Sequence, residues 1–93
     1  MRFKDLKFKD LYDGVQSIVK FGDDYELSIV RHSSSYGGSQ GLYEIAVFHN
    51  DGQIELQGIT KEGDTVKGYL TEQEVDGILL KMVAATGEDG VSC

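Results

Sequence analysis

Residues 43–56 read Y-E-I-A-V-F-H-N-D-G-Q-I-E-L, and this stretch decides the fold class of the chain. Apolar and polar side chains alternate on both sides of the N-D-G triplet, as they do in strands that bury one face. Asp-Gly is typical of a type I′ turn, because both central residues need a positive φ. Centring the turn on Asp51-Gly52 pairs His49 with Ile54. One face of the hairpin then carries Tyr43, Ile45, Val47, Ile54 and Leu56.

A second hairpin is predicted upstream of this one. Residues 14–21, G-V-Q-S-I-V-K-F, and residues 25–32, Y-E-L-S-I-V-R-H, both alternate and are separated by G-D-D. With these three residues as the loop, Lys20 lies opposite Glu26, which is a favourable charge pair across two strands.

The last third of the chain predicts one helix, over residues 71–86. It begins with T-E-Q-E, which has the capping-box pattern of a Thr followed three residues later by a Glu. We expect Gly77 to allow close approach to the sheet, Gly87 to end the helix and residues 87–93 to fray. The apolar side chains at helical spacing are Val75, Ile78, Leu79 and Met82.

These elements predict a single domain, residues 1–93, of the α+β class. An antiparallel sheet of four to five strands forms a meander of hairpins, and the C-terminal helix packs on one face. We expect the sheet within residues 14–60, a short strand over residues 65–70 and an edge strand within residues 1–12. Lysines in that first segment suit an edge, because they discourage pairing with other chains.

The charge of the chain limits its expected partners. The formal net charge is −7, from 16 acidic and 9 basic residues. An acidic body repels phosphate backbones, so direct nucleic-acid binding is not expected. No apolar run reaches the roughly 20 residues that span a membrane, and no secretory pattern opens the sequence. With a single cysteine, Cys93, the chain fits a reducing compartment, and we expect a cytoplasmic protein.

No catalytic or metal-binding pattern emerges from the residue types. His32 and His49 are expected on opposite faces of the sheet, roughly 20 Å apart at the strand rise, so they cannot share a zinc ion. The serines that follow His32 gain no base by adjacency alone. The glycine-rich run lacks the lysine and the helix of a phosphate-binding loop. We therefore expect no enzyme activity, no cofactor and no metal.

Residues 31–43, R-H-S-S-S-Y-G-G-S-Q-G-L-Y, form the first candidate binding region. Strand register brings Arg31 opposite Tyr43, and a guanidinium beside an aromatic ring could hold a small ligand at the loop mouth. The loop between them is either a mobile connection or a functional loop. The candidate residues are Arg31, His32, Tyr36, Gly37, Gly38 and Tyr43.

The second candidate region is the sheet face away from the helix. Alternation makes this face mainly polar, yet it also places Ile18, Val30, Ala46 and Phe48 there. Scattered apolar residues are ordinary on protein surfaces. The alternative is a contact face for a partner protein or a second copy of the chain, with Val30 and Phe48 as its contact residues.

Two segments carry a resemblance to known proteins: V-R-H-S-S-S-Y-G-G-S-Q-G-L-Y-E-I-A-V, residues 30–47, and G-Y-L-T-E-Q-E-V, residues 68–75. They resemble small, largely uncharacterised accessory proteins of tailed bacteriophages, over roughly residues 14–83. The resemblance implies expression inside an infected bacterium, and it implies no particular activity.

Together these observations predict a non-enzymatic phage accessory protein in the host cytoplasm. We expect it to bind and modulate or inhibit a host bacterial protein, for example a component of a defence system. Self-association through the open sheet face is a further option. The alternative function is binding and sequestering a nucleotide-like signal at the mouth formed by Arg31 and Tyr43.

Overall fold

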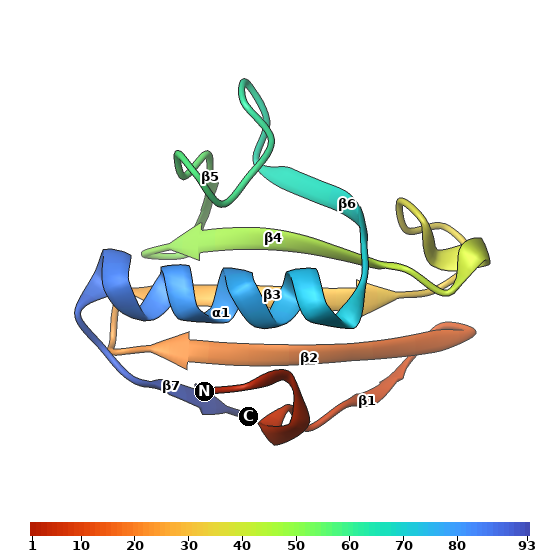
Figure 1. Cartoon of the computed structure of the whole chain (residues 1–93), viewed down its shortest axis with the longest axis horizontal. Coiled ribbons are helices and arrows are strands. Elements are labelled where there is room, and N and C mark those ends of the chain that lie inside the picture. Colours follow the sequence, from red (N-terminus) through yellow and green to blue (C-terminus); the bar gives the residue numbers. More distant parts are fainter.

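The computed structural model describes all residues, 1–93, and confirms an α+β fold. Three long antiparallel strands form the centre of the sheet: β2 (Gly14–Phe21), β3 (Tyr25–Arg31) and β4 (Tyr43–His49). The helix α1 (Glu72–Thr86) lies across one face of these strands (Figure 1). The sheet has seven strands, of which five follow meander order. This is more than the expected four to five, because short strands complete both edges.

Each edge of the three central strands is bordered by two short strands. β1 (Lys9–Leu11) and β7 (Gly90–Ser92) pair with successive parts of β2. β5 (Gly52–Ile54) and β6 (Val66–Leu70) share the free edge of β4 in the same way. Four short segments thus satisfy the outward backbone groups of β2 and β4.

The first hairpin has the predicted register. Lys20 pairs with Glu26, and its ammonium lies 3.9 Å from the Glu26 carboxylate. Gly22 opens the three-residue loop with a φ of 69°, in the left-handed region that glycine tolerates best.

The second hairpin is present, but its predicted register is wrong by two residues. His49 pairs with Gly52, so the turn is Asn50-Asp51 rather than Asp51-Gly52. Asn50 and Asp51 have φ values of 49° and 70°, and these two residue types are the ones besides glycine that enter the left-handed region most easily. A shift of two residues keeps every side chain on its predicted face.

The helix α1 has the predicted caps. The Thr71 hydroxyl accepts from the Glu74 N–H at 3.1 Å, and the Glu74 carboxylate accepts from the Thr71 N–H at 3.0 Å. Gly87 ends the helix with a φ of 72°. The expected role of Gly77 is wrong, since a methyl group there would meet no atom within 4 Å. No helix of the chain has the length and apolarity needed to cross a membrane.

The core lies between α1 and the sheet. It is a single cluster of 13 buried apolar residues, contributed by β2, β3, β4, β6, α1 and the segment before β6. The helix contributes the four residues predicted from its periodicity, Val75, Ile78, Leu79 and Met82.

The expectation for the N-terminal segment is confirmed in part, and that for the C-terminal segment is wrong. An edge strand is present within residues 1–12 but is short: Lys9–Leu11 pairs with β2, while Phe3–Asp5 forms a single 3₁₀ turn, η1. The C-terminal segment does not fray, because β7 pairs with β2 and the Cys93 N–H donates to the Ile18 carbonyl at 2.9 Å. The physical reason is the short length of β1, which leaves the rest of the β2 edge free for another strand.

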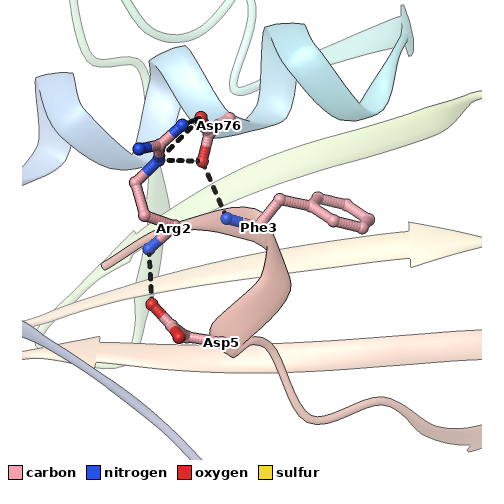
Figure 2. A network of polar contacts seen from close by, with 4 residues as sticks. All are labelled: Arg2, Phe3, Asp5 and Asp76. Carbon is pink, nitrogen blue, oxygen red and sulfur yellow. Dashed lines mark hydrogen bonds and ion pairs between the residues drawn. The ribbon is translucent and has the colours of Figure 1, made fainter.

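The segment before β1 is bound to α1 through Asp76 (Figure 2). The Arg2 Nε donates to both carboxylate oxygens, at 3.0 and 2.9 Å, and the Phe3 N–H donates to Oδ1 at 2.8 Å. These two donors hold the pKa of Asp76 below its ordinary value. The bond places the Phe3 ring against the rings of Phe8 and Tyr43, at centroid distances of 5.8 and 5.4 Å.

Candidate functional site

The structure brings Arg31 and Tyr43 together, as the register predicts. The Arg31 Nη1 donates to the Tyr43 hydroxyl at 3.1 Å, and the guanidinium carbon lies 5.0 Å from the ring centroid. Tyr43 is only 5% exposed, because the Phe3 and Phe8 rings pack on it. Burial raises the pKa of its hydroxyl, and the Arg31 charge opposes this rise. The pair belongs to the wall of the core, and neither residue lines any of the five main surface pockets.

The loop after β3 is closed by Ser35. The Ser35 hydroxyl accepts from the His32 N–H at 2.9 Å and donates to the His32 carbonyl at 2.8 Å. Ser35 and Gly37 are buried, and Gly37 has a φ of 88° just before a second 3₁₀ turn, η2 (Gly38–Gln40). A methyl group at Gly38 would overlap the His32 carbonyl. These hydrogen bonds and close contacts fix the conformation of the loop, which argues against its being a mobile connection.

His32 itself has a structural environment at the end of β3. Its Nδ1 accepts from the Ser34 N–H at 3.2 Å, and its ring meets the Tyr12 ring edge-on at 5.3 Å. The Ser33 side chain, together with the Ser33 N–H that donates to the Asp13 carboxylate at 3.0 Å, lowers the pKa of Asp13. The backbone N–H groups of Ser33 and Ser34 are therefore satisfied by the Asp13 carboxylate and by the His32 ring.

Tyr36 lies against β6 rather than beside the Arg31–Tyr43 pair. Its carbonyl accepts from the Tyr69 N–H at 3.1 Å, and its N–H donates to the Glu44 carboxylate at 3.1 Å. The side chains of Tyr36 and Tyr69 are 58% and 56% exposed. Tyr36 is thus separated from the Arg31–Tyr43 pair and forms a surface with β6 instead.

The face of the sheet opposite α1 carries a row of paired side chains. Cross-strand pairing joins Ile18 to Ser28, Ser28 to Ala46 and Ala46 to Val66, so the row crosses four strands. Its apolar members, with the two predicted contact residues, form a set that we call the open-face patch: Ile18, Val30, Ala46, Phe48 and Val66. All five are half-buried. Sequence reasoning missed Val66, because nothing in the sequence fixed where β6 would pair.

A pocket of about 600 Å³ lies beside β6. We call it the tyrosine groove, and its lining residues are Tyr36, Lys61, Asp64, Val66, Lys67, Gly68 and Tyr69. Of these, sequence reasoning identified only Tyr36. The others come from a strand and a preceding loop whose place in the sheet was not predictable, and no local motif marks them.

A bulge in β6 sets the position of Tyr69. Tyr43 pairs with Leu70 and Ile45 pairs with Lys67, so β6 uses one residue more than β4 over the same length. Tyr69 takes up this extra length with a φ of 58°. Left-handed backbone costs an L-residue about 1–2 kcal/mol, and it is rare for a bulky side chain. Gly68 precedes it because a methyl group there would overlap the Cβ of Tyr36.

The described residues contain no group of three or more His, Cys, Asp or Glu side chains placed to hold a metal ion. A smaller pocket of about 300 Å³ between the two hairpin turns is lined mainly by acidic side chains. Comparison with known proteins adds no family assignment: no protein-family model, no curated protein and no solved structure matches this chain.

Proposed function

We propose that this chain is a non-enzymatic accessory protein of a tailed bacteriophage that binds a protein of the infected bacterium and modulates or inhibits it. A component of a host defence system is one such target, and the host cytoplasm is the proposed location. The phage assignment is supported by the sequence resemblance of residues 30–47 and 68–75. The binding role is supported by the exposed face of the sheet.

The observation that carries the binding role is the open-face patch. The single α-helix covers only one face of the sheet, so the apolar row on the other face has no helix over it (Figure 1). Polar residues surround the row, including the Lys20–Glu26 pair. A partly apolar centre with a polar rim is the usual composition of a protein contact surface.

The same surface would also serve two copies of this chain. A standard interface buries about 800 Å² on each partner, whereas the whole chain exposes 5535 Å². A contact of that size would take about a seventh of the surface and would extend beyond the patch. The alternative function, ligand binding between Arg31 and Tyr43, gains no support from the geometry, because the Tyr43 ring is covered.

The test is a charge placed in the patch, at its end beside the two hairpin turns. Phe48→Glu should abolish capture of a stoichiometric host protein by the tagged chain, because a carboxylate would be desolvated in the contact. Gln53→Glu is the matched control, since Gln53 pairs with Phe48 on the same face, is exposed and gains the same charge. Sedimentation of both variants reports on self-association.

If Phe48→Glu captures the same protein with the same yield as the unmodified chain, the open-face patch is not the contact surface. Loss of capture in both variants would show that added charge alone prevents binding, which would also remove the support for an apolar contact. Circular dichroism of both variants confirms that each is folded.

A further inference from the structure

The basic residues after position 20 point to the tyrosine groove. After residue 20 the sequence has four bases, and two of them are occupied: Arg31 donates to Tyr43, and the Lys81 ammonium donates to the Gly58 carbonyl at 3.2 Å. The other two, Lys61 and Lys67, form no ion pair or side-chain hydrogen bond, and both line the groove. Within residues 21–93 the free lysine charge therefore lies at one pocket, while Lys4, Lys7 and Lys9 of the N-terminal segment form no ion pair either.

The residues that line the groove carry a small net positive charge. Asp64 is the only acidic residue that lines it, so the lining carries two positive charges against one negative charge. Lys67 also faces α1, where the pKa of Glu74 is lowered mainly by its hydrogen bonds with Thr71 and further by the Lys67 charge, without an ion pair. An anion entering the groove would therefore lie beside two lysines that form no ion pair, with the Glu44 carboxylate on the Tyr36 N–H nearby.

The two tyrosines of the groove are exposed, and the backbone of Tyr69 has an unusual conformation. Tyr36 and Tyr69 are both more than half exposed, and a backbone hydrogen bond of 3.1 Å joins the two residues. Tyr69 keeps its left-handed conformation although glycine or asparagine would adopt it more easily. Strained backbone of this kind is concentrated at functional sites. Tyr12 has a similar φ and is also exposed, so what distinguishes Tyr69 is its place beside Tyr36 and the two lysines.

We propose that the tyrosine groove binds a nucleoside phosphate. The phosphate would lie on the ammonium groups of Lys61 and Lys67, which act as point charges toward phosphate. The base would lie on the phenol rings of Tyr36 and Tyr69, as bases stack on aromatic side chains in other proteins. A volume of about 600 Å³ is within the usual range for sites of small molecules.

The charge distribution favours a small ligand over a nucleic-acid strand. A mononucleotide places all its charge next to the two lysines. A longer strand would continue onto a body with a net charge of −7 and would be repelled there. This site is separate from the role proposed for the open-face patch, although the two surfaces meet at Val66.

Equilibrium dialysis and NMR titration with AMP test the proposal. AMP should bind in both assays, while adenosine and ribose 5-phosphate should each bind at least about tenfold more weakly, because each lacks half of the recognised chemistry. The amide signals that shift should include Tyr69 and Gly68. A 12-nucleotide single strand should bind more weakly than AMP at the same ionic strength.

Tyr69→Gly is the decisive variant. It removes the ring and suits the left-handed backbone, so the melting temperature should be kept while AMP affinity falls about tenfold. Tyr12→Gly is its matched control, because Tyr12 is 85% exposed, has a φ of 54° and lies outside the groove. Lys61→Gln with Lys67→Gln should also weaken AMP binding and reduce its salt dependence.

Three results would overturn this site. AMP fails to bind, Tyr69→Gly binds AMP as tightly as the unmodified chain, or the oligonucleotide binds more tightly than AMP. None of these results bears on the Phe48→Glu experiment, so the groove and the open-face patch can fail independently.

Discussion

Replacing Ser35 by alanine tests whether the loop after β3 is a built part of the fold. The Ser35 hydroxyl is the only side-chain partner of the His32 N–H, and it also donates to the His32 carbonyl. The carbonyl keeps a second partner in the variant, because it also accepts from the Ser35 N–H at 3.1 Å. The variant therefore leaves the His32 N–H without its partner and removes the packing of the buried Ser35 hydroxyl.

The size of the effect follows from that donor. A backbone N–H that loses its partner away from water costs about 1–3 kcal/mol. His32 is partly exposed, which lets water compensate in part, so we expect about 1–2 kcal/mol at this position. For a domain of this size each kcal/mol shifts the melting temperature by about 4–8 °C. Ser35→Ala should therefore lower it by roughly 5–15 °C.

Thermal unfolding followed by circular dichroism measures this shift, and Ser34→Ala is the matched control. Ser34 is the preceding serine, it is exposed, and its hydroxyl forms no hydrogen bond within the chain. Hydrogen exchange adds a local readout, since the His32 amide should be protected in the control and exchange faster in Ser35→Ala. Equal melting temperatures for the two variants, with equal exchange at His32, would refute a structural role for this loop.

Two further predictions concern the helix α1. Asp76 has a pKa lowered from the ordinary 3.8 by Arg2 and the Phe3 N–H, so the stability it contributes is present above about pH 4 and is lost as the pH falls through the lower, folded value. Asp76→Asn should flatten the dependence of unfolding free energy on pH in that acid range, and an unchanged profile relative to an Asp10→Asn control would contradict this. Thr71→Ala removes one half of the capping box and should cost about 1 kcal/mol, or about 4–8 °C in melting temperature. Ser39→Ala is the comparison, because Ser39 is exposed and lies outside the helix, and an equal effect of both would argue against the cap.

The parts of the fold that were predictable are those specified by neighbouring residues. The register of the first hairpin follows from its three-residue loop and from the charge pair of Lys20 with Glu26. All of these residues lie close together in the sequence. The helix follows from its own cap and periodicity. In the second hairpin, the sequence allows a turn at either Asn50-Asp51 or Asp51-Gly52. Asn50 accepts a positive φ, and the Asn50-Asp51 turn forms.

The parts that were not predictable depend on distant segments. Whether Tyr43 faces a ligand or the core is decided by Phe3 and Phe8, which lie far from it in the sequence and reach it through the Arg2–Asp76 bond. The tyrosine groove likewise needs a loop residue, Tyr36, to meet a bulged strand. Periodicity along one strand carries no information about such pairings.

The strand β7 has a consequence for association of the protein. It is only three residues long, so it should detach from β2 far more often than the whole domain unfolds. Each detachment bares the backbone of Val19–Phe21 as a free strand edge. Two copies in this state would be able to pair edge to edge while their cores and helices stay folded. Association of the protein would then start from a folded domain rather than from an unfolded chain.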